Sequence, residues 1–301
     1  MKLVAVTGGL GNQMFEYAFM VRLSKDYDAR LFHPYGDQSE RYGHAGYQLE
    51  KVFTLRPKDW NWDVRITVYN LFWHFIRLFP KKKRPALLKI MGVNEVKTMD
   101  NFVFYPEVFL SQHKNELFMG TWQSWRYFEG AEDEVREAFT FQEELLNEYT
   151  RKMKLDIERC NSVSLHVRRD DYLLPNYIQG FGGICTVGYY KNAIKYLKQR
   201  IARPKVFVFS DDIDWCRENL AIEDATFVEG NHGNESWQDM YLMSRCCHNI
   251  IANSTFSWWG AWLNAHTDKI VIAPDRWWNG LADDVIPKMW IRISGDAKYD
   301  S

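Results

Sequence analysis

Residues 2–15 read KLVAVTGGLGNQMF, and this stretch decides the fold that the sequence predicts. Residues 2–7 have the apolar run of a buried strand, and the glycines that follow permit a tight turn. Apolar residues then recur at helical spacing over residues 14–25, and residues 29–33 have the composition of a second strand. A strand, a glycine loop, a helix and another strand indicate an α/β fold with a parallel sheet.

The second half of the chain repeats this order of elements. Between the halves, residues 57–150 have a mainly helical pattern. The pattern predicts strands over residues 102–105, 117–121, 162–167, 205–209, 249–252 and 270–273, the last of them closing the sheet. It predicts helices over residues 189–201, 237–245 and 256–266. We therefore expect two Rossmann-like domains facing a central cleft, formed by residues 1–155 and 156–301, with ligands beyond the carboxyl ends of the strands.

Composition excludes several classes of protein. The chain has 301 residues, 46% of them hydrophobic and 26% charged, which is typical of a folded domain and not of a disordered chain. A net charge of −1 gives no general attraction to nucleic acid, so any polyanion site must be local. The five cysteines lack CxxC spacing, which predicts reduced thiols. With no signal-peptide pattern at the start of the sequence, we expect a cytoplasmic protein.

Residues 71–85 allow two interpretations. The apolar stretch over residues 71–79 contains His74 and Arg77 and is too short to span a bilayer, and the basic run KKKRP follows it. Aromatic residues beside a basic cluster would suit peripheral contact with the inner face of a membrane. A solvated helix end explains the same pattern, and the sequence leaves both open.

The glycine loop at residues 8–13 favours an anion but not NAD. Gly9 and Gly11 match the first two glycines of GxGxxG, whereas Met14 occupies the third position. The second strand also ends at His33, where an NAD site has an acid for the ribose. Free N–H groups at the start of the next helix favour an anion, although the loop also fits a simple tight turn.

A basic segment ends the strand at residues 162–167. Strand alternation puts His166 and Arg168 on one face, and Arg169 follows directly. Two arginines at a strand's carboxyl end suit a diphosphate clamp. A salt bridge to Asp170 or Asp171 that pins the loop fits the pattern equally well.

Two further segments follow predicted strands. The run SDDID (residues 210–214) contains a DxD pattern, but residues 26–28 contain one too, so we favour capping of the next helix over a metal site, with Asp211 near the ligand. The run NSTFSWWGAW (residues 253–262) places small hydroxyls at a helix start, which suits a second phosphate cradle. Its three tryptophans suit a core, and both roles are compatible.

In this order, the segments GGLGNQMF (residues 8–15), HVRRDDY (166–172), FSDD (209–212) and NSTFSWWGAW (253–262) resemble the α-1,2-fucosyltransferases of glycosyltransferase family 11. The resemblance spans nearly the whole chain. It implies a GT-B fold and an inverting, metal-independent galactoside 2-α-L-fucosyltransferase, without a cofactor. The donor would be GDP-β-L-fucose, and the acceptor the 2-hydroxyl of a terminal β-galactoside.

The resemblance also implies roles for individual residues. Arg168 would bind the β-phosphate, Asn12 would lie near the fucose, and Asp239 would bind the guanine. The donor-binding set would further contain Gly9, Gly11, Gln13, His166, Arg169, Asp211, Asn253, Ser254, Thr255, Phe256 and Ser257. For the base, Glu16 and the leaving phosphate are equal candidates, while Asp171 either helps in catalysis or orients Arg168. Residues 172–188, with Gly180, Gly182 and Gly183 inside the segment, form either a lid or a passive loop.

Other classes of function remain as alternatives. A non-catalytic sugar- or nucleotide-binding protein would keep the aromatic residues, but it would not need paired arginines beside a phosphate cradle. A transferase that uses another nucleotide sugar would keep both. An oxidoreductase is disfavoured by the incomplete GxGxxG pattern.

Overall fold

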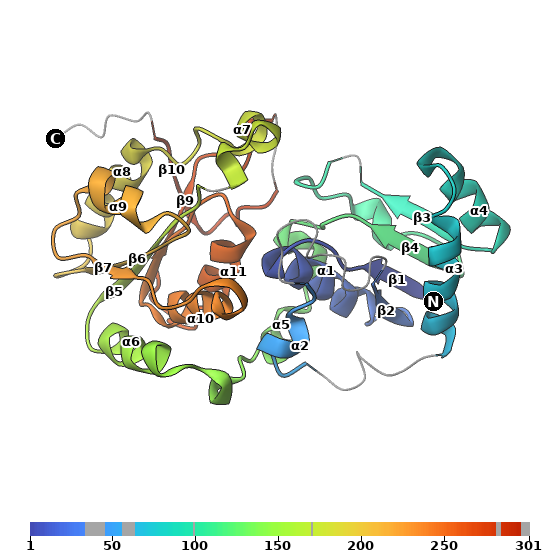
Figure 1. Cartoon of the computed structure of the whole chain (residues 1–301), viewed down its shortest axis with the longest axis horizontal. Helices are drawn as coiled ribbons and strands as arrows, with labels where there is room; N and C mark the ends of the chain where they lie inside the picture. The colour runs from blue at the N-terminus through green and yellow to red at the C-terminus, as the bar shows by residue number, and fades with distance from the viewer. Residues whose placement is uncertain (34–45, 56–63, 99, 170, 281–283, 296–301) are drawn as a thin grey trace. The chain divides into compact units, whose positions relative to one another are not determined.

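The computed structural model describes residues 1–33, 46–55, 64–98, 100–169, 171–280 and 284–295, with only the backbone at residues 64–66. The chain divides into two compact units, residues 1–142 and 143–301 (Figure 1). The division falls before α6 (Glu148–Glu158), whereas the sequence placed it at residues 155 and 156. This helix belongs to the second unit because Asn147, which caps it, bonds to Asn231 and Gln238. That the two halves face a cleft stays a prediction.

The first unit contains a four-stranded parallel sheet in the order β2-β1-β4-β3. Its strands are β1 (Lys2–Ala5), β2 (Ala29–Phe32), β3 (Asn94–Lys97) and β4 (Glu116–Met119). The sequence pattern missed β3, whose residues NEVK include a single apolar side chain. The strand predicted at residues 102–105 is wrong, because this segment is a turn in which Phe104 packs on Tyr127 and the backbone N–H of Tyr105 donates to the Tyr127 hydroxyl.

Helices cover both faces of this sheet. Alternation along β4 points Leu117 toward α3 and α4 and Phe118 toward α1, where its ring meets Phe19 edge-on. The helices and 3-10 turns of this unit are α1 (Leu10–Leu23), α2 (Leu49–Val52), α3 (Val64–Ile76), η3 (Lys81–Lys83), α4 (Arg84–Ile90), η4 (Pro106–Phe109), η5 (Trp125–Phe128) and α5 (Glu132–Ala138). α1 is buried on nearly every side, as its apolar sequence requires.

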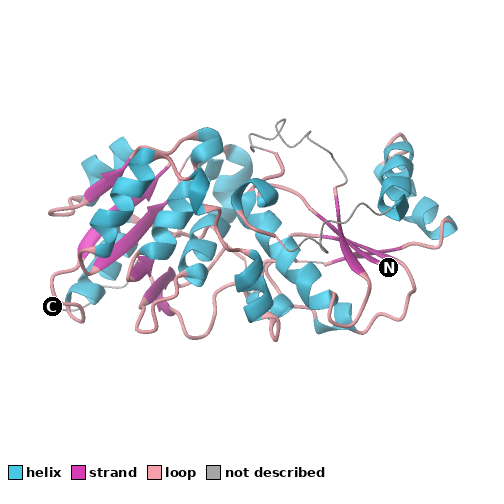
Figure 2. Ribbon diagram, turned by 90° about the horizontal axis from the view of Figure 1, so that it is seen from below, coloured by secondary structure: helices cyan, strands magenta, loops and turns pink. Residues whose placement is uncertain are grey.

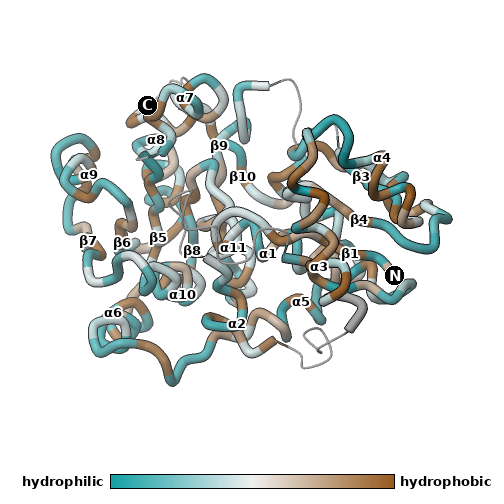
Figure 3. The backbone as a smooth tube through the Cα atoms, turned by 45° about the vertical axis from the view of Figure 1, so that its right-hand side comes forward, coloured by the Kyte–Doolittle hydropathy of each residue, from teal (hydrophilic) through white to brown (hydrophobic). Residues whose placement is uncertain are grey.

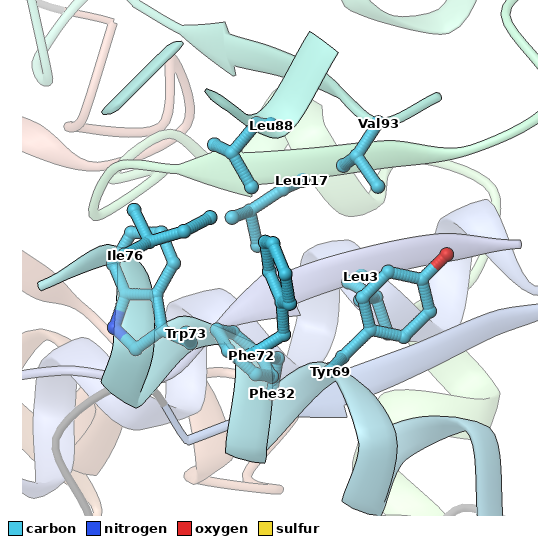
Figure 4. A pocket seen from close by; sticks show the side chains of 9 residues that line it. All are labelled: Leu3, Phe32, Tyr69, Phe72, Trp73, Ile76, Leu88, Val93 and Leu117. Atoms are coloured by element: carbon cyan, nitrogen blue, oxygen red, sulfur yellow. The ribbon is translucent and has the colours of Figure 1, made fainter. Parts of the chain in front are cut away.

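A narrow apolar cavity lies between the sheet and the pair α3 and α4. Trp73 and Ile76 of α3 and Leu88 of α4 point toward the sheet and are almost fully buried. Figure 4 shows the residues that line the cavity, which are Leu3, Phe32, Tyr69, Phe72, Trp73, Ile76, Leu88, Val93 and Leu117. The inner face of α3 therefore holds this helix on the sheet.

The second unit contains a six-stranded parallel sheet in the order β10-β9-β8-β5-β6-β7. Its strands are β5 (Ser162–Val167), β6 (Lys205–Ser210), β7 (Thr226–Val228), β8 (His248–Ile250), β9 (Val271–Pro274) and β10 (Ile291–Ile293). The prediction that residues 270–273 close the sheet is wrong, since β10 follows and pairs with β9 at its edge. β7 and β10 have three residues each, too few for an alternating pattern to identify them.

Helices also lie on both sides of this second sheet, as Figure 2 shows. They are α6, α7 (Pro175–Phe181), α8 (Val187–Lys198), α9 (Ile213–Leu220), α10 (Trp237–Arg245) and α11 (Thr255–Leu263), with the 3-10 turns η6 (Glu143–Leu145), η7 (Asp171–Leu173) and η8 (Gly233–Glu235). No helix in the described parts of the chain is both long and apolar enough to cross a bilayer.

In each sheet the later strands are added on both sides of the first strand, so the strand order changes direction there. β6 and β7 follow on one side of β5, while β8, β9 and β10 follow on the other. β2 lies on one side of β1, and β4 and β3 lie on the other. Loops diverge at such a switch point, and in open α/β sheets ligands bind there, beyond the carboxyl ends of the two central strands. The switch points are therefore between β5 and β8 and between β1 and β4.

Gly8 makes the turn that leads from β1 into α1. Its φ is +70°, in the left-handed region that favours glycine, and an added Cβ would lie 2.7 Å from Asn12 Nδ2. Gly92 provides a comparison, since its φ is +73° but nothing lies within 4 Å of an added Cβ. Of these two glycines, Gly8 alone combines this backbone conformation with a close side chain.

We expect Gly8→Ala to destabilise the protein more than Gly92→Ala. Gly92→Ala should lower the free energy of unfolding by about 1 kcal/mol, the cost of a Cβ in the left-handed region. Gly8→Ala should cost about 1 kcal/mol more, because the Asn12 side chain, whose Oδ1 accepts a hydrogen bond from Gln123 Nε2, must move away and lose that bond. Urea unfolding of both variants measures the difference, and equal losses would contradict the proposed collision.

Candidate functional site

Arg168 lies at the switch point of the second sheet, directly after β5. Its Nε donates to Asp171 Oδ1 at 2.8 Å, and its Nη1 lies 3.1 Å from Asp211 Oδ2 at the end of β6. Burial lowers the pKa of Arg168, but the hydrogen bond to Asp171 and the charge of Asp211 outweigh it and leave this pKa raised. The side chain keeps about a third of its surface exposed. Arg168 is thus a fixed cation that still faces solvent.

Arg169 is held in a different way. Its Nε donates to Asp212 Oδ2 at 2.9 Å, and its guanidinium lies over the Trp215 ring, 3.9 Å from the centroid. Its backbone N–H donates to Asp211 Oδ1. These contacts fasten the loop after β5 to the start of α9, so Arg169 supports the loop. Asp170, the other partner that the sequence suggested for the arginines, lies outside the described residues.

The capping role predicted for the aspartates after β6 is confirmed. The Asp212 carboxylate accepts a hydrogen bond from the Trp215 backbone N–H at 3.1 Å and caps α9. Asp214 is exposed and forms a salt bridge with Arg217 at 3.3 Å. Both carboxylates of the DxD pattern therefore already have cationic or backbone partners. Across the described ranges, no group of three His, Cys, Asp or Glu side chains is arranged to hold a metal ion.

His166 is a buried neutral imidazole beside Arg168. Burial and then the charge of Arg168 lower its pKa to about 3, so the ring stays neutral at physiological pH. Its Nδ1 is buried and has no hydrogen-bond partner among the described residues. Its ring centroid lies 5.9 Å from that of Phe256, the second residue of α11. An unpaired buried nitrogen at the end of β5 is suited to a polar ligand.

The start of α11 lies on the other side of the switch point, after β8. Ser254 is its N-cap but makes no side-chain capping bond, so the side chain does not compete for the first N–H groups of the helix. Such N–H groups and the helix dipole attract anions. Thr255 and Phe256 in this first turn are partly exposed. Trp258, Trp259 and Trp262 are buried, which confirms their core role.

Asn253 and Ser257 support this turn from inside. The Asn253 amide donates to the carbonyls of Phe181 and Trp277 at 3.2 and 3.1 Å, and its backbone carbonyl accepts from the Tyr172 hydroxyl. The Ser257 hydroxyl donates to backbone carbonyls behind it, and both side chains are buried. Their hydrogen-bonding capacity is used by the protein, so we correct their sequence-based interpretation as ligand contacts to a supporting role.

Asp239 lies in the first turn of α10, the helix that follows β7. Its Oδ1 accepts from Asn231 Nδ2 at 2.8 Å, and Asn231 is in turn held by Asn147 and Thr150. Burial raises the pKa of Asp239 to about 7, although the hydrogen bond from Asn231 opposes the shift. The carboxyl group is oriented by an amide chain and titrates near neutrality.

The glycine loop of the first unit meets the loop after β4 at the other switch point. Asn12 Oδ1 accepts from Gln123 Nε2 at 3.0 Å. Gln123 follows Trp122, a fully buried residue whose φ of 49° is rare for a bulky side chain. Gly9 is the N-cap of α1 and Gly11 lies buried in its first turn. The structure thus holds the Asn12 amide at the carboxyl end of β1.

Gln13 supports the same loop from inside. Its Nε2 donates to the carbonyls of Gly8 and Gly46 at 2.9 and 2.8 Å, and its Oε1 accepts from the Gln48 backbone N–H. The side chain is 2% exposed. The interpretation of Gln13 as a donor contact is therefore corrected to a supporting role.

Glu16 has the same kind of role. Its side chain is fully buried, its Oε2 accepts from the Thr7 backbone N–H and its Oε1 from the Thr7 hydroxyl, both at 2.8 Å. Burial raises its pKa well above the usual range, against the effect of these hydrogen bonds. A carboxyl group that is fully enclosed and bonded to the loop has no open side that faces an acceptor hydroxyl. The structure does not support Glu16 as the base.

Sequence reasoning missed Gln123 and Asn231. Each is a carboxamide in the loop after a strand, and each orients a side chain that the sequence had singled out. Their position after a strand is the only local signal. Their partners, Asn12 and Asp239, are 111 and 8 residues away along the chain.

The fold resembles solved fucosyltransferases. The structure superposes with a TM-score of 0.54 on NodZ α-1,6-fucosyltransferase soaked with GDP-fucose, over 87% of this chain and 91% of that one, at 16% identity. NodZ from Bradyrhizobium gives 0.53 in another crystal structure, over 86% and 90%, again at 16% identity. With its parallel sheets, the protein thus has the α/β fold of GT-B-like glycosyltransferases.

Sequence comparison then identifies the family. The model of glycosyl transferase family 11 matches residues 99–294. An α-1,2-colitosyltransferase from Escherichia coli is 34% identical over 96% of this chain and 97% of its own length. The O-antigen biosynthesis glycosyltransferase WbnK of Escherichia coli is 32% identical over 91% and 94%. The chain belongs to glycosyl transferase family 11.

A more distant relative covers only part of the chain. Galactoside α-(1,2)-fucosyltransferase 1 of Ateles belzebuth is 31% identical over 50% of this chain and 43% of its own length. The similarity to this animal enzyme is thus limited to about half of either protein.

We expect Glu16→Gln to keep the pH dependence of glycosyl transfer and at least half of kcat, because an amide can still accept from the Thr7 N–H. Glu16→Ala should lower the free energy of unfolding by about 3 kcal/mol, since it leaves a cavity and an unpaired buried N–H. Rate–pH profiles and urea unfolding measure these effects. Loss in Glu16→Gln of the rise in rate from low pH, with the wild type keeping that rise, would restore Glu16 as the base.

Proposed function

We propose that the protein transfers L-fucose from GDP-β-L-fucose to the 2-hydroxyl of a terminal β-galactoside, with inversion and without a metal ion. The observation that carries the proposal is the fixed cation Arg168 opposite the start of α11, at the switch point of the second sheet. The names of the fucosyltransferase relatives and the GDP-fucose soak of the similar NodZ structure support this choice of donor.

Arg168 and α11 would share the diphosphate. When the bond between the sugar C1 and the diphosphate breaks, negative charge grows on the β-phosphate and must be offset in place. The Arg168 guanidinium is held by Asp171 and Asp211 before any ligand arrives, so it needs little reorganisation to reach its position in the transition state. The first N–H groups of α11, with Ser254, Thr255 and Phe256, would bind the diphosphate and ribose from the other side.

Asp239, His166 and Asn12 would contact the rest of the donor. A carboxylate accepts well from the two N–H groups of a guanine edge, and Asn231 already orients that of Asp239. The unpaired His166 nitrogen would bond to the ribose or phosphate. Asn12, oriented by Gln123, would contact the transferred sugar.

We further propose that no side chain serves as a dedicated base. Glu16 is enclosed by the protein and Asp171 is paired with Arg168, so neither carboxylate is placed to take a proton. The acceptor oxygen would attack C1 from the face opposite the diphosphate, forming the new bond as the old one breaks. Its proton would pass through water to an oxygen of the leaving GDP, which lies on the opposite face of the sugar and gains charge in the same step.

The similarity to a colitosyltransferase favours a second candidate donor. That relative is 34% identical over nearly the whole chain. Colitose is L-fucose without its 3-hydroxyl, so the two donors share the GDP group and differ in one hydroxyl of the sugar. A site that hydrogen-bonds this hydroxyl would reject the deoxy sugar strongly, whereas a site that does not would accept both.

A donor and acceptor panel tests the proposal. Purified protein is incubated with GDP-fucose, GDP-colitose, GDP-mannose or UDP-galactose and a set of β-galactosides, with and without EDTA. We expect transfer from GDP-fucose that EDTA leaves unchanged, and a product whose NMR spectrum shows an α-1,2 linkage. Transfer from GDP-colitose alone would replace the fucose assignment, and loss of turnover in EDTA would refute metal independence.

We expect Arg168→Lys to lower kcat by about 10²–10³, because an ammonium cannot keep both aspartate contacts and the phosphate contact. Its circular dichroism spectrum should match that of the wild type. Arg217→Lys is the matched control, since Arg217 forms an exposed salt bridge with Glu229, and its turnover should be unchanged. Near wild-type kcat in Arg168→Lys would refute the proposed role.

We expect the protein to bind GDP-fucose more weakly as the pH is lowered through the pKa of Asp239. This pKa is raised to about 7 in the free protein, and only the deprotonated form accepts from guanine. Kd should therefore rise about tenfold from pH 8 to pH 6, as the carboxylate fraction falls. Asp239→Asn should bind more weakly and show no such dependence. Calorimetric titration measures both proteins, and parallel pH profiles would exclude Asp239 from guanine binding.

A further inference from the structure

α3 carries a second apolar face that points away from the sheet. Val68, Leu71, Phe75 and Leu78 are all exposed, with exposed fractions of 75% for Leu71 and 81% for Leu78. At 100° per residue these positions fall within one side of the helix and the turn after it. Figure 3, where hydrophobic residues are brown, shows how much of α3 is apolar.

This outer face is not needed to hold α3 in place. Trp73 and Ile76 on the inner face are buried against the sheet around the cavity of Figure 4. Large apolar side chains that gather on an exposed helix face, without a packing role, mark a site of contact with another apolar phase or partner.

Cationic side chains adjoin the apolar face. Lys81, Lys82 and Lys83 form η3, which begins three residues after Leu78, and they are exposed. Within the described ranges none of these three lysines forms a salt bridge. Lys89 and Ile90 extend the pattern along α4, with Ile90 83% exposed. Since the whole chain has a net charge of −1, this positive charge is local.

We propose that this surface docks on an anionic lipid bilayer. We call it the α3–α4 face and define it by Val68, Leu71, Phe75, Leu78, Lys81, Lys82, Lys83 and Ile90. The apolar side chains would enter the boundary between headgroups and acyl chains, while the lysines would meet anionic headgroups. The inference is independent of the donor and acceptor proposed above.

The positive charge of the α3–α4 face favours an anionic lipid surface over other occupants. A second exposed apolar group lies on α7, at Leu174, Tyr177 and Ile178, but residues 171–183 contain no Lys or Arg. That group therefore has no neighbouring positive charge that could attract an anionic surface. Three adjacent lysines would also repel the same face of a second copy, which disfavours self-association through this surface.

Sedimentation with lipid vesicles tests the proposal on the full chain. We use phosphatidylcholine vesicles with and without about a third of phosphatidylglycerol, at low and high salt. We expect binding to the anionic vesicles only, and weaker binding as salt screens the lysines. No binding to anionic vesicles at low salt would overturn the proposal.

Two pairs of matched variants assign the binding to this face. Lys81→Glu/Lys82→Glu/Lys83→Glu should weaken the partition coefficient by a hundredfold or more, at about fivefold per lysine. The control Lys114→Glu/Lys191→Glu/Lys288→Glu changes the net charge equally at three exposed lysines elsewhere. Leu71→Glu should weaken it by about tenfold or more, whereas Leu110→Glu, at a leucine with the same 75% exposure, should not.

Folding and self-association are followed in the same samples. The melting temperatures of all four variants should stay within about 4 °C of the wild type, because the altered side chains are exposed. Equal loss of binding in variants and controls would overturn the assignment to the α3–α4 face. So would light scattering that shows a wild-type dimer which Leu71→Glu dissociates, since a second copy would then be the occupant.

Discussion

The candidate site depends on the pairing of Arg168 with two carboxylates from different segments. Asp171 comes from the loop after β5 and Asp211 from the end of β6, so the guanidinium is held only when the two strands lie side by side. A half-buried cation loses hydration, and these carboxylates offset that loss. The partial exposure that remains is what permits an anionic ligand to reach it. The same pairing ties the loop after β5 to the sheet and fixes the position of the guanidinium.

Around Arg168 and its two carboxylates, most polar residues of the motifs form hydrogen bonds that support the loops of the protein itself. Asn253 and Ser257 bond to carbonyls below α11, Arg169 fastens its loop to α9, and Gln13 and Glu16 hold the glycine loop from inside. Buried polar groups must be paired, and a loop of irregular backbone offers many unpaired groups. Part of each motif therefore forms hydrogen bonds with the backbone of its own loop. The residues of the motifs that we propose as ligand contacts are Arg168, Thr255, Phe256 and Asn12.

α3 combines two roles in one helix. Its inner face completes the hydrophobic core of the first unit, and its outer face, with η3 and α4, has the composition of a membrane-facing surface. Both faces are apolar, which explains why the sequence here lacks the simple pattern of one apolar and one polar side.

Local pattern alone determined much of this protein. The strand at residues 162–167, the helix at residues 237–245 and the cap at Asp212 agree with the structure, because alternation, helical spacing and capping depend on neighbours within one turn or strand. Only tertiary structure decided the roles of Glu16 and Gln123 and the existence of β3, β7 and β10. Burial, and partners as distant as the 111 residues between Asn12 and Gln123, are properties of the folded chain. The sequence could therefore locate the candidate loops at the ends of the strands, but folding decided which of their side chains the protein itself uses for support.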